Sequence, residues 1–198
     1  MGTLKTINIK HASAAANVNN IVLSSDGSTT FHNISNLQTG KIIQCKTAVK
    51  LDTVSSDDTD YSEISTDLRI TITPTSATSK IIVNANLYMH TEQTMSLRLL
   101  KKETSAGSSW TMVNTPTTFS SNNDGNAAFY AGNTARPLMV TPLQVIETAG
   151  STNERYYSPH WRIDVVTGGH KNWLNKYDDT HNSGWNGTSS MTIMEVAA

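Results

Sequence analysis

The sequence has little charge of either sign and almost no cysteine. Of its 198 residues, 16% are charged, and the formal net charge is -1. Attraction to nucleic acid or to an anionic membrane is therefore not expected as the main activity, because such binding needs a clear excess of basic residues. The low net charge also argues against intrinsic disorder, which usually accompanies high net charge.

Long apolar runs are missing as well. No stretch approaches the roughly 20 apolar residues of a membrane span, so membrane insertion is not predicted. Residues 1–20 lack the continuous apolar core of a signal peptide. A single cysteine, Cys45, excludes an intramolecular disulfide. Its place in the apolar phase of a predicted strand favours a small buried side chain over a reactive thiol.

Motifs that carry chemistry are also lacking. The sequence contains no HExxH or CxxC-type metal pattern, no GxSxG motif and no Gly-rich phosphate loop. We therefore predict a protein that is not an enzyme and has no catalytic residue, cofactor or metal site. His170 and His181 share a segment with Asp178 and Asp179, so metal binding stays an alternative to solvated loop residues. A glycosidase pair at Asp178 and Asp179 is a further alternative, although adjacent carboxylates need not face one another across a sugar.

What the sequence does contain is alternation of apolar and polar residues. In "SKIIVNANLYMH", Ile81, Val83, Ala85, Leu87 and Met89 fall on one face of a predicted strand. The preceding "DLRITITPTSATS" alternates in the same way and then reaches Pro74 and a Ser/Thr turn. We expect these two runs to form a hairpin.

Further strand candidates follow at regular spacing, with polar turns between them. They are "KIIQCKTAVKL" with Ile43, Cys45, Val49 and Leu51 in phase, "MSLRLLKKE", "PLQVIET", "RYYSPHWRIDVV" and "SSMTIMEV". Residues 168–187 are predicted to be the longest loop. Many strands without helices between them predict an all-β fold, an antiparallel β-sandwich or jelly roll, over residues 41–198.

Residues 1–40 differ from the rest. They contain only short β fragments, with too few apolar and aromatic side chains to bury a core alone, so they are predicted to need a partner. We interpret them as an N-terminal attachment and trimerisation segment, with a loose leader as the alternative. The apolar side chains that would make these contacts are Ile7, Ile9, Ile21, Leu23 and Phe31.

The last residues, "SSMTIMEVAA", read as a strand rather than as a polar tail. Ile193 points to one face, and Met194 and Val196 point to the other. Such a strand either helps to close the sandwich or meets identical copies near a symmetry axis. Met194 and Val196 are accordingly predicted as trimer contacts.

Aromatic and polar side chains gather in the predicted loop 168–187. Trp173, Tyr177 and Trp185 lie near Asp178 and Asp179, and this composition is typical of a glycan or protein contact site. Flat rings cover the apolar face of a sugar, and the carboxylates accept hydrogen bonds from its hydroxyls. The alternative is that the tryptophans anchor the loop onto the sandwich.

Several of these pieces, in this order, resemble one family. "LQTGKIIQCKTAVKLDTVSS", "DLRITITPTSATSKIIVNANLYM", "SLRLLKKE" and "SSMTIMEVAA" are similar to the C-terminal domain of tail fibre proteins of tailed phages, particularly marine and cyanobacterial ones. "ASAAANVNNIVLSSDGSTTF" resembles the attachment or shaft repeats that precede such domains. The resemblance covers most of residues 38–102 and 188–198.

The resemblance implies a homotrimeric virion protein with a β-sandwich tip, assembled in the host cytoplasm. Its expected partners are its own copies, other virion proteins of tail, neck or capsid, and a host surface glycan or outer-membrane protein. Only about forty residues precede the tip, whereas fibres usually carry a long shaft. A capsid or neck decoration protein without receptor binding is therefore the first alternative, and a carbohydrate-active enzyme or a free lectin is a more distant one.

Overall fold

The computed structural model consists of two compact units. The described residues are 8–9, 21–23, 29–31, 40–91, 93–114, 127–130, 138–164, 169–176 and 186–198. One unit consists of residues 1–41 with Ala198, and the other runs from Ile42 to Ala197. Every strand pair is antiparallel, and the only helical element in the described part is the 3-10 turn η2, Thr66–Leu68. The predicted all-β class is confirmed.

The first unit holds three short strands. They are β1 (Asn8–Ile9), β2 (Ile21–Leu23) and β3 (Thr29–Phe31), and they pair in the order β1-β2-β3. Ile9 is opposite Ile21, and Ile21 is opposite Phe31. The apolar fragments of the sequence are therefore aligned in one small sheet.

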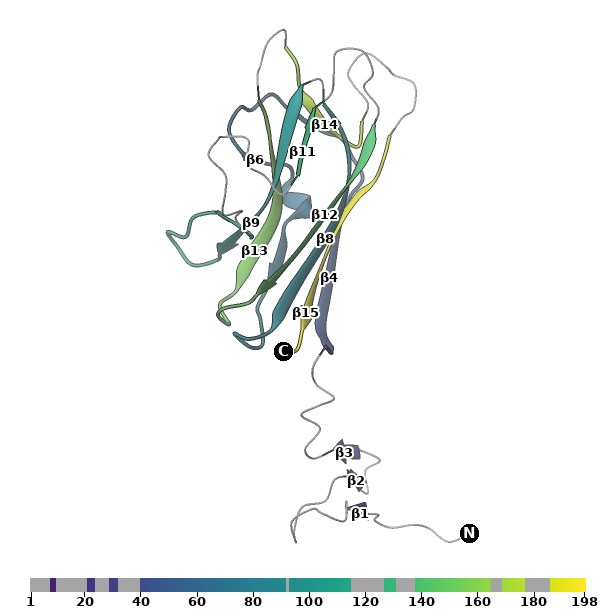
Figure 1. The fold of residues 1–198 in the computed structure, drawn as a ribbon, viewed down its shortest axis with the longest axis vertical. Coiled ribbons are helices and arrows are strands. Elements are labelled where there is room, and N and C mark those ends of the chain that lie inside the picture. Colours follow the sequence, from purple (N-terminus) through teal and green to yellow (C-terminus); the bar gives the residue numbers. More distant parts are fainter. Residues whose placement is uncertain are drawn as a thin grey trace, which may run out of the picture. The chain divides into compact units, whose positions relative to one another are not determined.

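The second unit is an antiparallel sandwich of two six-stranded sheets (Figure 1). One sheet has the order β10-β9-β13-β6, with β7 paired to β13 and β11 to β9. Its strands are β6 (Ser62–Glu63), β7 (Ile70–Ile72), β9 (Thr94–Glu103), β10 (Thr111–Met112), β11 (Ala127–Tyr130) and β13 (Arg155–Ile163).

The other sheet has the order β4-β15-β8-β14-β5, and β12 pairs with β8 along the edge opposite to β14. Its strands are β4 (Ile42–Lys50), β5 (Val54–Ser56), β8 (Lys80–Thr91), β12 (Met139–Thr148), β14 (Asn172–Leu174) and β15 (Ser189–Val196). Pro142 lies inside β12, which has no second neighbour among the described strands and so tolerates a residue without an N–H.

The core lies between the sheets and follows the alternation in the sequence. On β8, Ile81, Val83 and Leu87 are at most 1% exposed, and on β9 Leu97 and Leu99 are fully buried. Tyr157 and Trp161 of β13 fill the same layer. Large apolar side chains from both sheets thus share one core, which is the main source of stability for a domain of this size.

Two local predictions are wrong. The runs around residues 68–73 and 80–90 do not form a hairpin, because β7 pairs with β13 and β8 belongs to the other sheet. The turn after Pro74 therefore carries the chain from one sheet to the other. Cys45, predicted to be buried, is exposed on β4.

The C-terminal strand β15 lies inside its sheet, between β4 and β8. Ile193 is fully buried, whereas Met194 and Val196 are half-buried on the opposite face. This matches the predicted alternation. The strand closes the sandwich because the first strand of the domain, β4, is held to the sheet through it.

Candidate functional site

Trp173, predicted as an exposed contact ring, is buried in the structure. It lies in β14, opposite His90 of β8 and Ser55 of β5, and is 4% exposed. Its ring centroid is 5.3 Å from that of His90. A ring with so little exposure cannot cover a sugar or a protein partner at the surface. The prediction of a surface contact is therefore wrong for Trp173, and the alternative of an anchoring tryptophan describes it.

The other predicted site residues are placed as follows. Four candidate contact residues and one candidate trimer contact lie outside the described residues and stay predictions: Tyr177, Asp178, Asp179, Trp185 and Ile7. Ile9, Ile21, Leu23 and Phe31 lie in the three-stranded sheet of the first unit. Met194 and Val196 point to the outer face of the sandwich, next to exposed apolar residues discussed below.

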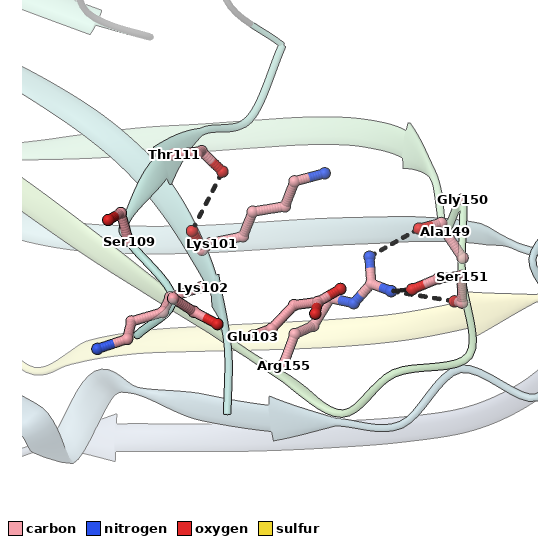
Figure 2. Close-up of a pocket in the computed structure, with 10 residues that line it drawn as sticks. Lys101, Lys102, Glu103, Ser109, Thr111, Ala149, Gly150, Ser151 and Arg155 are labelled. Carbon is pink, nitrogen blue, oxygen red and sulfur yellow. Dashed lines mark hydrogen bonds between the residues drawn. The ribbon is translucent and has the colours of Figure 1, made fainter. Parts of the chain in front are cut away.

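A pocket of about 370 Å³ opens beside the turn that joins β12 to β13 (Figure 2). Most of the residues that line it are of polar or charged types, and they include Lys101, Glu103, Ser109, Ser151 and Arg155. Arg155 is 4% exposed, and its guanidinium donates to the carbonyls of Ala149 at 2.6 Å and Ser151 at 3.0 Å. These bonds, with those to Ser151 Oγ and the Asn153 carbonyl, tie the turn to β13.

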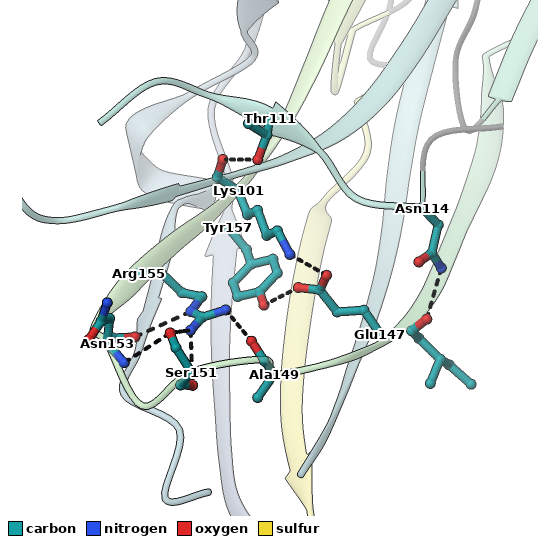
Figure 3. A network of polar contacts seen from close by, with 10 residues as sticks. Lys101, Thr111, Asn114, Glu147, Ala149, Ser151, Asn153, Arg155 and Tyr157 are labelled. Atoms are coloured by element: carbon teal, nitrogen blue, oxygen red, sulfur yellow. Dashed lines mark hydrogen bonds and ion pairs between the residues drawn. The ribbon is translucent and has the colours of Figure 1, made fainter. Parts of the chain in front are cut away.

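A second polar network closes the same end of the core (Figure 3). The Glu147 carboxylate accepts hydrogen bonds from the Tyr157 hydroxyl and from Lys101 Nζ, each at 2.5 Å. Burial, and next the charge of Glu147, raise the pKa of Tyr157 well above its ordinary value. In both networks the charged groups are hydrogen bonded within the protein, Arg155 to carbonyl and hydroxyl oxygens and Glu147 to Tyr157 and Lys101, so we assign them to structure rather than to ligand binding.

The most developed candidate for binding is the outer face of the other sheet. Alternate residues of β9 and β13 point away from the core there, in register with one another, as His160 opposite Arg98 and Tyr156 opposite Lys102 show. We call this surface the arginine–aromatic face and define it by six partly exposed residues: Tyr61, Arg69, Arg98, Trp110, Tyr156 and Arg162.

Cations and rings are stacked throughout the arginine–aromatic face. The Arg98 guanidinium carbon lies 3.7 Å from the centroid of Tyr61, and that of Arg162 lies 5.7 Å from the same ring. Arg69 lies 5.3 Å from Tyr156 and 5.7 Å from Trp110. These distances fall in the range of cation–π attraction, and each stack holds a flat guanidinium and a ring in a fixed orientation.

Glu63 fixes Arg69 at the centre of the face. Arg69 Nε donates to Glu63 Oε1 at 2.8 Å, its Nη2 makes a second, short bond to Oε2, and Ser158 Oγ donates to Oε1 at 2.6 Å. Burial alone would raise the pKa of Glu63, but these hydrogen bonds outweigh it and leave the pKa below its ordinary value. The carboxylate stays ionised at neutral pH and holds the guanidinium in a bidentate pair.

His160 lies beneath Trp110 and is 3% exposed. The two ring centroids are 4.9 Å apart with an interplanar angle of 62°. Burial lowers the pKa of His160, so the imidazole is neutral at pH 7 and supports the tryptophan as an apolar surface.

Among the described residues, no group of three or more His, Cys, Asp or Glu side chains is arranged to hold a metal ion. No helix within the described ranges is long and apolar enough to cross a membrane.

Periodicity could not reveal the arginine–aromatic face, because its residues come from segments near positions 61, 69, 98, 110, 156 and 162 that only strand pairing brings together. The one available signal was the outward phase of "SLRLLKKE", which places Arg98 away from the core. No protein-family profile matches the sequence, and no curated protein matches it significantly.

Proposed function

We propose that this chain is a structural protein of a phage virion. It forms a short tail-fibre-like homotrimer, attaches to the particle through residues 1–40 and displays the sandwich for contact with the host surface. Two features support the proposal: the sequence resemblance to tail fibre C-terminal domains, and an antiparallel sandwich preceded by a separate small β unit.

The arginine–aromatic face carries the adhesive part of the proposal. Tryptophan, tyrosine and arginine are the residues that most often dominate the binding energy of interfaces. On this face they are partly exposed and held in place by neighbours, as in the Arg98–Tyr61 stack at 3.7 Å and the Arg69–Glu63 pair. A contact surface that is fixed before binding loses little side-chain entropy on binding, which favours affinity.

Adsorption of variant particles tests this part. We expect particles with Tyr61→Ala and Arg98→Ala to adsorb to host cells at least tenfold more slowly than wild-type particles, because truncating a hot-spot pair costs about 1.4 kcal/mol or more. Ser109→Ala is the matched control, since Ser109 is exposed on a neighbouring loop outside the face. The comparison requires that each variant protein is incorporated into particles in the same amount as the wild type.

The outcomes separate the alternatives. Unchanged adsorption of the double variant would remove the arginine–aromatic face as the contact surface. If Trp185→Ala alone slowed adsorption, the contact would lie in the loop predicted from sequence instead. Cryo-electron microscopy of the particle locates the protein, and a position on the capsid or neck with no effect of either variant would favour a decoration protein. Release of reducing ends from host polysaccharide would contradict the proposal of a protein without catalytic activity.

A further inference from the structure

The large apolar side chains that are exposed among the described residues all lie on or beside two strands of one sheet. Ile42, Ile43, Val49 and Leu51 belong to β4 or directly follow it, and Val140 and Ile146 belong to β12. Their exposed fractions range from 40% to 73%. Four of the six, Ile42, Val49, Val140 and Ile146, have register partners that place them on the same face of the sheet. Exposed apolar residues are ordinary when scattered, whereas a concentration on one face indicates an interface.

β4, β15, β8 and β12 run side by side in one sheet (Figure 1), and their register joins the two outer strands through the two inner ones. Cys45 is opposite Met194, Met194 is opposite Ile82, and Ile82 is opposite Ile146. One apolar row therefore runs across β4, β15, β8 and β12. Opposed residues in an antiparallel sheet point to the same face, so the row lies on one side of the sheet.

We call the outward residues of these four strands the neutral face. They are Ile42, Cys45, Thr47, Val49, Lys80, Ile82, Asn84, Asn86, Tyr88, Val140, Pro142, Gln144, Ile146, Thr148, Ser190, Thr192, Met194 and Val196. Lys80, at one end, is the only charged residue of the set, and its Nζ donates to Thr148 Oγ1 at 2.7 Å. Gln44 and Lys46 of β4 point to the other side, where they donate to the carbonyls of Thr73 and Thr71.

The composition of the neutral face suits contact with its own copies. A patch with charge of one sign repels an identical patch, whereas this one has almost no charge to repel. Apart from Lys80 and Tyr88, its polar members are asparagine, glutamine, serine and threonine, which both donate and accept hydrogen bonds and can therefore pair with identical residues. Thr47 and Thr192 already show such a pairing within one chain, with their hydroxyl oxygens 3.0 Å apart.

The size of the neutral face also fits self-association. The face extends along β12 from Val140 to Thr148, about nine residues at about 3.3 Å each, and across four strands at about 4.8 Å spacing. These dimensions give a face of about 30 by 19 Å. The plan area is about 600 Å² before the relief of side chains is added. A stable protein interface uses about 800 Å² of accessible surface on each partner, which is of the same order.

We infer that the neutral face is the surface through which copies of this chain associate, packed around a common axis. The apolar row from Cys45 to Ile146 lies at the centre of that contact. The inference deepens the proposed function and rests on its homotrimer. Its occupant is another copy of the chain, not a host molecule, which the arginine–aromatic face on the other sheet would bind.

Sedimentation equilibrium of the full chain tests the inference. In Val49→Lys/Ile146→Lys, the two substituted side chains are 50% and 52% exposed in the wild type, so folding should be retained. Identical lysines from neighbouring copies would meet in the apolar contact. We expect the wild type to sediment as a trimer of the 21.5 kDa chain, and the variant to associate at least a hundredfold more weakly.

Ala106→Lys/Ser109→Lys is the control for added charge. Both positions are exposed in the turn between β9 and β10, on the other sheet, so the control should remain a trimer. Near-ultraviolet circular dichroism of the buried Trp161 and Trp173 verifies that all variants are folded. A neutral-face variant that associates like the wild type would overturn the inference while leaving the homotrimer intact. A wild type that is monomeric at all concentrations would overturn both, and particle adsorption would still judge the adhesive part separately.

Cys45 gives a second measurement on the native thiol, with no added label site. It is the only thiol and lies at the β4 end of the apolar row. We expect its reaction with a thiol reagent to slow as the wild-type concentration rises through the association range, and to stay fast in Val49→Lys/Ile146→Lys. Protection that is independent of concentration would mean that a segment of the same chain covers the face, and would overturn the inference. Equal reactivity in monomer and trimer would overturn it as well.

Discussion

Gln44 and Glu195 are 151 positions apart in the sequence, and their side chains are hydrogen bonded at 2.6 Å. They are also opposed in the pairing of β4 with β15. The same carboxylate accepts bonds from the Thr75 N–H at 2.8 Å and the Thr75 hydroxyl at 2.7 Å. A fully buried carboxylate near the end of β15 therefore joins three segments: β4, the chain after β7, and β15 itself.

Replacement of this carboxylate should destabilise the fold. In Glu195→Gln the negative charge is lost, and one amide N–H₂ would face the donors of Gln44 and Thr75. We expect a loss of about 1.5–3 kcal/mol in the free energy of unfolding, the usual range for hydrogen bonds to charged groups. Urea denaturation at pH 7 measures it. Thr53→Ala is a suitable control, because Thr53 is exposed, and an equal loss in both variants would contradict the assigned role.

The Glu195 carboxylate also makes the free energy of unfolding depend on pH in the acidic range. Burial alone would raise the pKa of Glu195, but the hydrogen bonds lower it from 4.5 to about 2. Because the folded-state pKa is depressed, the stabilisation is present above pH 4.5 and is lost as the pH falls from about 4.5 towards 2. Denaturation curves at several pH values should show this loss in the wild type. Glu195→Gln should lose less stability over the same interval, and parallel curves would contradict the expectation.

Gly187 should tolerate no side chain. A Cβ atom at this position would lie 2.4 Å from Cγ and 2.6 Å from Cβ of Tyr88. These Tyr88 atoms are close to the backbone of β8 and cannot swing away. Gly187→Ala should therefore cost about 1–3 kcal/mol through overpacking. The double variant Gly187→Ala/Tyr88→Ala should recover part of this loss in thermal unfolding, and simple additivity of the two changes would argue against the clash.

We expect Trp173 to contribute to the stability of the fold rather than to contact with a host. Removing its buried ring in Trp173→Ala should cost about 3–5 kcal/mol, as for other buried aromatic residues. Trp173→Phe keeps a ring against His90 and should lose less. Guanidinium denaturation of the three proteins checks this order. A wild-type stability for Trp173→Ala would mean that the ring is not part of the packed structure.

Tyr157 should resist ionisation in the folded protein. Its raised pKa means that the hydroxyl keeps its proton above pH 10, where a tyrosine of the unfolded chain loses it. Stability therefore falls as the pH rises above 10, since the unfolded state releases a proton that the folded state retains. Above pH 10, the phenolate absorbance of the native wild type should equal that of native Tyr157→Phe. After denaturation, the wild type should show the absorbance of one more ionised tyrosine than the variant. A difference between the native proteins would show that Tyr157 ionises while folded.

Sequence periodicity identified most of the long strands and their buried faces. The alternate residues of β8 and β9 are buried as the alternation indicated: Ile81, Val83, Ala85, Leu87, Met89, Leu97 and Leu99. Alternation does not say which strand is the neighbour, so the chain after Pro74 was read as a hairpin although it changes sheets. Nor does it say which of two faces meets the core, and this explains the error at Cys45.

The candidate site was harder to predict from the sequence than the fold. Trp173 lies in a three-residue strand, β14, which is too short to show a period, so it was read as part of a loop. The arginine–aromatic face depends on pairing between β13 and the strands β6, β7 and β9, which are separated by up to a hundred positions. Local patterns contain no information about such distant pairing.

The position of β15 has a consequence for synthesis on the ribosome. Until residues 189–196 have emerged, β4 has no neighbour within its sheet among the described strands, and β8 lacks its partner on that side. Two strand edges and the core side of the sheet then stay open to aggregation until β15 has emerged. The sandwich cannot be completed gradually from its N-terminal side. A ribosome that stalls before residue 189 would release a chain with a split sheet, a natural substrate for chaperones and proteases.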